Sequence, residues 1–462
     1  MATQKKEIKM QTIAAIATPP AEGGIAVIRI SGDRAADIAA RVFRPVSGRD
    51  ISEMKGYTAC YGEIYDGGKR LDDGVLLIYR APHSYTGEDT AEISCHGGVY
   101  AAKRVLSACC SAGAVPAQAG EFTKRALLNG KMSLTQAEAV ADIIGAQNEQ
   151  FLLCSKSQQE GALYRRIKAV SEKLLSLVTL IQAWIDYPDE MEDEFDGNLE
   201  AEKLRDVSDE LTRLIESHGE GQLIKDGIPC AIVGRPNVGK STLMNLLTGT
   251  ERSIVTDIEG TTRDIVEETV TVGGVMLRLA DCAGIRETDD VVESIGVERM
   301  IKKLGEAAVV LAVFDLSRPL SDDDERLIKL LDGKRVVCIA NKNDLDEKAD
   351  VPALESRFGS VVRISAKDPD CLDAVAKAVA SVSGLGKLDL NAGFIANERQ
   401  RLCAEQARDA VNEALAALES GMTLDAVSVM CETALDRLYE LSGEQVSETV
   451  IDQVFRRFCV GK

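Results

Sequence analysis

The sequence predicts a multidomain protein with an α+β domain first and an all-α domain that is interrupted by an inserted α/β domain. Three observations predict this. Residues 1–129 contain strand-like runs separated by glycine and proline turns, whereas residues 130–222 and 386–462 show helical periodicity. Residues 223–385 carry a phosphate-loop motif and several short buried strand patterns. The length of 462 residues fits about three domains.

The N-terminal domain, residues 1–129, is expected to alternate strands with two helices. Apolar runs bounded by Gly, Pro and Ser turns indicate the strands. The predicted strands are Thr12–Ala17, Ile25–Ile30, Gly74–Tyr79 and Asp89–Ser94, and the predicted helices are Arg34–Phe43 and Tyr100–Ala112.

The pattern changes to helix at Ser133, which forms a capping-box motif with Gln136. Helical character is expected as far as Tyr187, and an acidic, solvated loop follows at 189–194. Another amphipathic helix is predicted from about Leu199, and the chain is helical again after residue 397, with breaks near glycines 421 and 443. Because the termini of inserted domains lie close together, the two helical pieces should pack into one domain.

The phosphate-loop motif follows a short buried strand, Ile228–Val233, and precedes an apolar helix. Its glycines let successive backbone N–H groups point at phosphate oxygens, and the helix N-terminus adds positive potential. Lys240 should reach the β- and γ-phosphates, and the Ser241 hydroxyl should bind Mg²⁺. The residues predicted to contact the nucleotide here are Asn237, Val238, Gly239, Lys240, Ser241 and Thr242.

Four more nucleotide elements follow in order. Gly260-Thr261-Thr262 can place a second hydroxyl on Mg²⁺, and Asp281-Cys282-Ala283-Gly284 can serve the metal and the γ-phosphate. Asn341-Lys342-Asn343-Asp344 places Asp344 to accept hydrogen bonds from the two donors of guanine that adenine lacks. Ser365-Ala366-Lys367 is similar to the loop that covers the base in GTPases. Together these motifs predict a Ras-like α/β P-loop GTPase domain.

Ile285 stands directly after the Asp-x-x-Gly motif, where Ras-like GTPases carry the Gln that orients the attacking water. An Ile side chain has no polar group, so the water-positioning group must come from elsewhere in the chain, or hydrolysis must be slow.

The composition limits which other classes of protein are possible. The net charge of 54 − 74 = −20 argues against nucleic-acid binding over the whole surface, so a polyanion partner needs a local basic patch or a second protein. No apolar run reaches the roughly 18 residues of a membrane span, and no signal region follows Met1, so we expect a cytoplasmic protein that binds no membrane. The 12 cysteines form no Cys-x-x-Cys pair and are interpreted mostly as free buried thiols.

The motifs and the insertion layout resemble the family of tRNA-modification GTPases called MnmE or TrmE, over essentially the whole chain. The segments that carry the resemblance include Ala17–Pro20, Arg29–Gly32, Tyr85–Asp89, His96–Gly98, Gly120–Phe122, Gln136–Ala139 and the C-terminal Cys459-Val460-Gly461-Lys462.

The resemblance implies that the chain acts with the flavoprotein MnmG (GidA), which carries the FAD. The two would install an aminomethyl or carboxymethylaminomethyl group on C5 of the wobble uridine, position 34, of certain tRNAs. The one-carbon unit would come from 5,10-methylene-tetrahydrofolate, for which 5-formyl-tetrahydrofolate is an analogue. The N-terminal domain would bind the folate and form a homodimer, and meeting of the GTPase domains across the dimer, with K⁺, would stimulate hydrolysis.

The resemblance also assigns residues. The folate contacts would be Arg29, Glu92, Lys131 and Lys462, although each residue alone, without the family resemblance, is better interpreted as part of a surface ion pair. The K⁺ ligands would be Asn237, Thr256, Ile258 and Thr261, the Mg²⁺ ligands Ser241 and Thr262, and the catalytic carboxylate Glu293. The remaining predicted GTP-site residues are Asp257, Glu259, Gly260, Asp281, Cys282, Ala283, Gly284, Asn341, Lys342, Asp344, Ser365, Ala366 and Lys367, with no chemical role assigned to Cys282.

Cys459 lies in the C-terminal tail, beside Gly461 and Lys462. A nearby ammonium makes a thiol more reactive, so we assign Cys459 a catalytic role, either as a thiolate brought in by a flexible arm or as a positioning group. The alternatives are a frayed terminus for the tail and, for the whole chain, a ribosome-assembly or regulatory GTPase switch, or a scaffold that uses GTP only to change shape. The tRNAs used and the nitrogen source, glycine or ammonium, stay open.

Overall fold

The computed structural model describes residues 11–187, 197–250, 268–279, 304–384, 391–456 and 458–462. The chain divides into two compact units, and each is described by itself. One unit combines Met1–Ala141 with Leu438–Lys462, and the other is Asp142–Arg437. Within the described residues, no helix is both long enough and apolar enough to cross a membrane.

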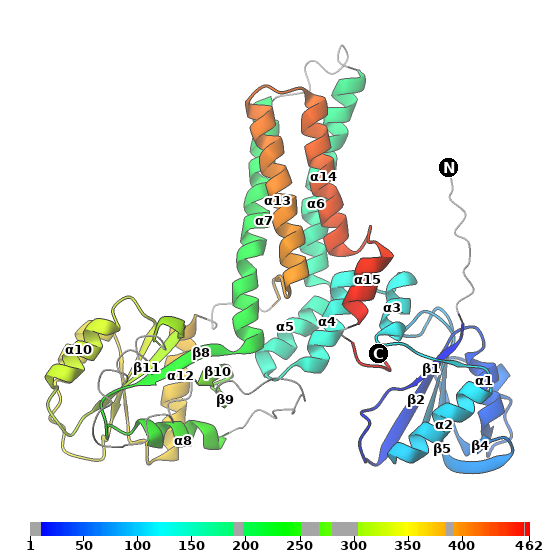
Figure 1. Cartoon of the computed structure of the whole chain (residues 1–462), viewed down its shortest axis with the longest axis horizontal. Coiled ribbons are helices and arrows are strands. Elements are labelled where there is room, and N and C mark those ends of the chain that lie inside the picture. Colours follow the sequence, from blue (N-terminus) through cyan, green and yellow to red (C-terminus); the bar gives the residue numbers. More distant parts are fainter. Residues whose placement is uncertain (1–10, 188–196, 251–267, 280–303, 385–390, 457) are drawn as a thin grey trace. The chain divides into compact units, whose positions relative to one another are not determined.

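The N-terminal unit is built on a seven-stranded sheet with the order β3-β4-β5-β6-β2-β1-β7 (Figure 1). The helices α1 and α2 pack on one face, where Ile28, Leu76 and Ile93 from three adjacent strands are buried in a common core. The bounds are β1 Ile13–Ile16, β2 Ile25–Ser31, α1 Ala35–Val42, β3 Phe43–Pro45, β4 Thr58–Asp66, β5 Lys69–Tyr79, β6 Thr90–His96, α2 Val99–Ser111 and β7 Val115–Pro116. The four predicted strands and two predicted helices are confirmed, although β5 begins five residues earlier than predicted, whereas β3, β4 and β7 were missed.

Three short helices complete this unit. They are α3 Glu121–Leu128, the start of α4 Leu134–Gly145, and α15 Glu448–Phe455. The predicted capping box is present at the start of α4, because Ser133 N donates to Gln136 Oε1 at 2.9 Å and Gln136 N donates to Ser133 Oγ at 3.3 Å. Phe455 and Phe458 pack with Ala137 and Val140 in one apolar cluster, so the end of the chain belongs to the N-terminal unit.

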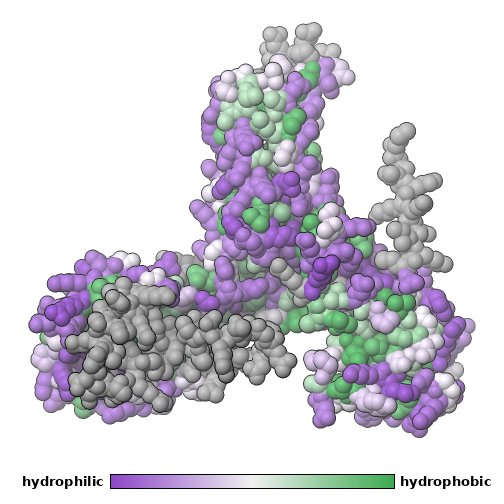
Figure 2. Space-filling model, viewed as in Figure 1, coloured by the Kyte–Doolittle hydropathy of each residue, from purple (hydrophilic) through white to green (hydrophobic). Residues whose placement is uncertain are grey.

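The second unit contains a helical bundle and an α/β sheet. The bundle helices are α5 Glu149–Gln159, α6 Ala162–Asp186, α7 Gly197–Asp226, α13 Glu398–Glu419 and α14 Leu424–Ser442. Ser208 of α7 donates to Asn412 of α13 at 2.7 Å, which confirms that the helical pieces before and after the insertion pack together. Hydrophilic residues predominate on the visible face of the bundle (Figure 2), as expected for helices that bury only one stripe.

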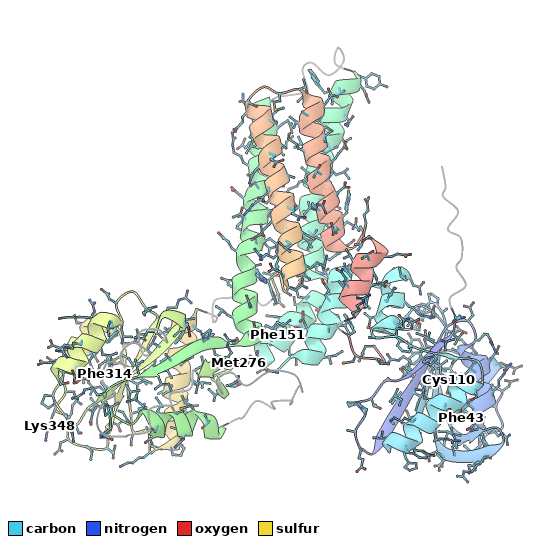
Figure 3. All side chains as sticks on the ribbon, viewed as in Figure 1. Phe43, Cys110, Phe151, Met276, Phe314 and Lys348 are labelled. Carbon is cyan, nitrogen blue, oxygen red and sulfur yellow. The ribbon has the colours of Figure 1, made fainter. Side chains whose placement is uncertain are left out.

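The inserted sheet has the order β13-β12-β11-β8-β10-β9, with only β9 antiparallel to its neighbour. Every residue of β11 is buried: Val309, Leu311 and Val313 face the core under α8 and α12, and Val310, Ala312 and Phe314 face the core under α10 and α11. Phe314 and the N-terminal core residue Phe43 are marked in Figure 3. The bounds are β8 Ile228–Val233, α8 Lys240–Thr250, β9 Glu268–Val272, β10 Val275–Leu279, β11 Val309–Asp315, α10 Asp322–Leu330, β12 Val336–Asn341, α11 Val351–Phe358, β13 Val361–Ile364 and α12 Leu372–Ser383.

The predicted strand Ile228–Val233 is confirmed as β8, and helices cover both faces of the sheet, as the predicted α/β class requires. The four-part division at residues 129, 222 and 385 stays a prediction. The strand β9 was missed, because it follows the Gly-Thr-Thr segment without a clear apolar run of its own.

Candidate functional site

The phosphate loop connects β8 to α8 and has the sharp turns that its glycines permit. Gly234 has a φ of +155°, and a Cβ added there would lie 2.4 Å from Val313 O. Gly239 has a φ of +104°, and a Cβ there would lie 2.1 Å from Asn341 Nδ2. Only glycine fits such contacts, so the two motif glycines are required by the loop's close approach to β11 and to the end of β12.

Lys240 begins α8, and its side chain folds back over the loop. Its Nζ donates to Gly234 O at 2.9 Å and to Arg235 O at 2.7 Å. Ser241 and Thr242 are exposed in the first turn of α8. The loop therefore presents an ammonium, two hydroxyl-bearing residues and a helix N-terminus on one side, which is the donor set that a triphosphate with Mg²⁺ requires.

The base-recognition motif meets this loop at the ends of the parallel strands. Buried Asn341 donates from Nδ2 to Val238 O at 2.7 Å and accepts at Oδ1 from Ala366 N at 2.9 Å. One side chain thus joins the phosphate loop, the Asn-Lys-x-Asp segment and the Ser-Ala-Lys loop. Lys367 Nζ lies 3.9 Å from Asp344 Oδ2, so the residue predicted to read guanine stands beside the covering loop.

Asp315, at the end of β11, is a residue that sequence reasoning missed. Lys342 Nζ lies 2.6 Å from Asp315 Oδ2 and donates to Asn237 O at 2.9 Å. Burial raises the pKa of Asp315, but hydrogen bonds from Lys342 and Ser317 outweigh it, so its pKa lies below the usual value. Asp315 could have been identified from the sequence, because it is an acidic residue directly after a fully apolar strand pattern.

Several predicted residues of the GTP site lie outside the described residues. They are Thr256, Asp257, Ile258, Glu259, Gly260, Thr261, Thr262, Asp281, Cys282, Ala283, Gly284 and Glu293. Their roles stay predictions.

The second predicted site lies on the sheet face of the N-terminal unit that α1 and α2 do not cover. Arg29 of β2 and Glu92 of β6 are directly opposite each other, with Nε and Oε1 2.7 Å apart. The Arg29 guanidinium also lies 5.6 Å from the ring centroids of Tyr85 and Phe122. Burial and the Glu92 carboxylate raise the pKa of Tyr79, whose hydroxyl lies 3.5 Å from Glu92. An ion pair thus lies between aromatic rings.

Lys131 is held by the loop that carries Tyr85. Its Nζ donates to Pro82 O at 3.0 Å. Arg125, only 3% exposed, pairs with Glu88 of the same loop at 3.1 Å and with Glu121 at 2.8 Å. This buried pair fixes the loop against α3, where Phe122 lies. Tyr85, Phe122 and the Arg125–Glu88 pair were not assigned roles from sequence, although Tyr85 and Glu88 belong to a segment that carries the family resemblance.

The C-terminal tail is docked against the segment that leads into α3. Val460 forms an antiparallel bridge with Ala119, and Phe122 N donates to Lys462 O at 3.1 Å. Gly461 has a φ of +100°, and a Cβ there would lie 2.3 Å from Ile16 O. The backbone of the last four residues is therefore paired and is neither a free arm nor frayed. Lys462 reaches Phe122, and hence the neighbourhood of Arg29 and Glu92.

Cys459 differs from the other cysteines. Among the eleven that the structure describes, none of which is in a disulfide, only Cys459 is exposed. Burial raises the pKa of Cys95 to about 11 and that of Cys109 to about 12. These buried thiols are protonated at neutral pH, in agreement with the interpretation of most cysteines as inert.

Comparison with known proteins agrees with this geometry. Residues 12–131 match the family described as the GTP-binding protein TrmE N-terminus, and residues 134–459 match the MnmE helical domain. The tRNA modification GTPase MnmE of Geobacillus kaustophilus is 41% identical over 98% of this chain and 100% of its own length. That of Acetivibrio thermocellus is 39% identical over 98% of this chain and 100% of its own.

A crystal structure of Era from Aquifex aeolicus is 28% identical over 39% of this chain and 65% of its own, with a TM-score of 0.26. This similarity is confined to a part of the chain and carries no further argument. The full-length relatives and the two family matches decide the assignment: the chain belongs to the MnmE family of tRNA modification GTPases and is a GTP hydrolase.

Proposed function

We propose that this chain uses GTP hydrolysis to drive modification of C5 of the wobble uridine of tRNA, together with the flavoprotein MnmG. The product would be an aminomethyl or carboxymethylaminomethyl uridine at position 34. The observation that carries the proposal is the docking of the C-terminal tail on Ala119 and Phe122, because the Phe122 ring lies 5.6 Å from the guanidinium of Arg29, the partner of Glu92. A GTPase that acts only as a switch or a scaffold has no use for this second site.

The residues at the N-terminal site fit a reduced folate. Arg29 and Lys131 suit the carboxylates of its glutamate portion, and Glu92 suits the N–H edge of a pterin. The rings of Tyr85 and Phe122 offer flat apolar contacts beside these charges. When bound, methylene-tetrahydrofolate would supply the one-carbon unit. The protein's own part is to orient that group and to hold the tail that carries the exposed Cys459.

The uncovered sheet face supports the proposed homodimer. Outward-facing Val75 is 41% exposed, Tyr61, its direct partner across β4 and β5, is 55% exposed, and Ile25 is 67% exposed. Apolar side chains on a strand face are normally covered, and a second copy of the N-terminal unit would cover these. A dimer would also bring two GTPase domains together, as the family resemblance implies.

In the GTPase domain, Ser241 would hold Mg²⁺ together with Thr262, and Asn237 would hold K⁺ with groups from residues 256–261. Mg²⁺ and K⁺ would neutralise charge on the phosphates. Lys240, the loop N–H groups and the start of α8 bind and orient the phosphates, and Asp344 selects guanine.

The test is mass spectrometry of wobble uridine from cells that lack this protein, complemented with the wild-type chain or with an Arg29→Ala variant. We expect the C5 modification to be lost without the protein, restored by the wild type and not restored by Arg29→Ala. Unchanged wobble uridine in the deletion strain would exclude the proposed function and favour a switch.

A further inference from the structure

Arg235, the second residue of the phosphate loop, occupies a position that the motif leaves free. Its Nε lies 2.9 Å from Oδ1 of Asp324, in the first turn of α10. The Asp324 side chain is 1% exposed and that of Arg235 is 23% exposed. The pair joins the phosphate loop to a helix that lies 87 to 95 residues further along the chain than Arg235 and supplies none of the known motifs.

Asp324 has two separate partners for its two oxygens. Oδ2 accepts from Ser321 N at 2.9 Å and from Ser321 Oγ at 3.0 Å, which completes the capping box of α10. Oδ1 faces Arg235, and within the described part of the chain neither Oδ1 nor Arg235 Nε has a hydrogen-bond partner. The 2.9 Å contact is therefore a charge pair and not an aligned hydrogen bond. Burying a carboxylate without a nearby cation costs free energy of folding, and the guanidinium of Arg235 offsets this cost for Asp324.

Neighbouring acidic residues show that this orientation is specific to one position. Asp322 and Asp323 share the first turn of α10 with Asp324, where any carboxylate benefits from the helix dipole. The Asp323 side chain is 71% exposed and lies 3.5 Å from Arg326 on the surface. A general preference for acid at a helix start explains all three residues, but not the burial of Asp324 against the phosphate loop.

The pair connects to the phosphate-binding lysine through one peptide group. Arg235 O accepts a hydrogen bond from Lys240 Nζ at 2.7 Å, and Gly234 O accepts a second at 2.9 Å. Gly234 lies close to β11, because a Cβ added to it would be only 2.4 Å from Val313 O. The side chain of Arg235 is held by Asp324, so this contact helps to fix the position of the carbonyl that binds Lys240.

We propose that Asp324 is a positioning residue for GTP hydrolysis, which acts through Arg235 to fix the carbonyl that orients Lys240. The interactions of Lys240 with the phosphates must be made at a defined position in the transition state, where charge develops. Ground-state binding of GDP is spread over several loop N–H groups and depends less on any one of them. Loss of the Arg235–Asp324 pair should therefore lower kcat more than it lowers nucleotide affinity.

The experiment compares Asp324→Asn with Asp323→Asn in the full-length protein. Asp324→Asn keeps the size and an acceptor for Ser321 but removes the charge that faces Arg235. We expect kcat for GTP hydrolysis, per GDP-binding site, to fall about tenfold, while GDP affinity changes less than about threefold. Asp323→Asn removes the same charge from the same helical turn and should leave kcat unchanged.

Arg235→Gln provides the second route to the same test, because it removes the other partner without altering α10. It should show the same loss as Asp324→Asn, and the double variant should be no worse than either single variant, because both break one connection. Wild-type kcat in folded Arg235→Gln, or fully additive losses in the double variant, would overturn the proposal. A lower melting temperature with an unchanged kcat per site would show that the pair only stabilises the fold.

Discussion

Arg29 Nε lies 2.7 Å from Glu92 Oε1, and the two residues are direct partners across β2 and β6. Each side chain is 18% exposed, so the pair is largely buried but still reaches the surface. Charged groups in such partial burial bind complementary charges more strongly than fully hydrated groups do.

We therefore predict that Glu92→Gln weakens binding of 5-formyl-tetrahydrofolate about tenfold, roughly 1.4 kcal/mol, because the amide keeps the shape but loses the charge. Isothermal titration calorimetry on the full-length protein measures this. Glu63→Gln is the matched control, since Glu63 pairs with Arg70 on the exposed β4–β5 hairpin, where the two side chains are 35% and 55% exposed. Equal losses in both variants would show that the folate does not bind at Arg29 and Glu92.

The Arg29–Glu92 site also shows which features could not be predicted from the residues alone. The phosphate loop, the Asn-Lys-x-Asp segment and the helix cap at Ser133 were predictable because each is local, with partners a few residues apart. Arg29 and Glu92 were named only through the family resemblance, because 63 residues separate them and only strand register brings them together. Docking of the tail on Ala119 and Phe122 joins the two ends of the chain, and no local pattern reports such a contact.

The cation prediction concerns Asn237, which has a φ of +64° in the phosphate loop. We expect faster GTP turnover in K⁺ than in Na⁺, because a K⁺ held at the phosphates can replace the charge of an arginine finger, worth about 10³–10⁵ in rate. Asn237→Gly should remove this difference without straining the loop, because glycine accepts a positive φ. Asn245→Ala, on the exposed face of α8, is the control. If the wild-type protein hydrolyses GTP at the same rate in K⁺ and in Na⁺, the cation hypothesis is wrong.

Glu293 is predicted to orient the attacking water that Ile285 cannot. Glu293→Ala should lower kcat and leave GTP affinity nearly unchanged, because the interaction is made only in the transition state. Single-turnover hydrolysis and equilibrium binding of a labelled GTP analogue separate the two quantities. A large loss of affinity would instead assign Glu293 a structural role.

The Asp315–Lys342 pair should make the GTPase domain sensitive to acid. The folded-state pKa of Asp315 is lowered, so its contribution to stability is present above the unfolded pKa and is lost as the pH falls through the folded value. Asp315→Asn should lower the free energy of unfolding by about 1–3 kcal/mol near neutral pH, with a difference from the wild type that shrinks below pH of about 4. Scanning calorimetry at several pH values measures this free energy from the unfolding transition that GTP stabilises. A difference that stays constant down to pH 3 would contradict the assignment.

The last prediction separates the thiol of Cys459 from the position of the tail. Cys459→Ser leaves the bridge between Val460 and Ala119 intact, because only backbone atoms form it. We expect this variant to lose wobble-uridine modification while GTP hydrolysis and dimerisation persist. Gly461→Ala should have the same phenotype for another reason: at a φ of +100°, its Cβ would collide with Ile16 O and displace the tail. Limited proteolysis should release the tail in Gly461→Ala but not in Cys459→Ser. If Cys459→Ser modifies tRNA normally while Gly461→Ala does not, the thiol has no essential role and the docked position of Lys462 accounts for the tail's importance.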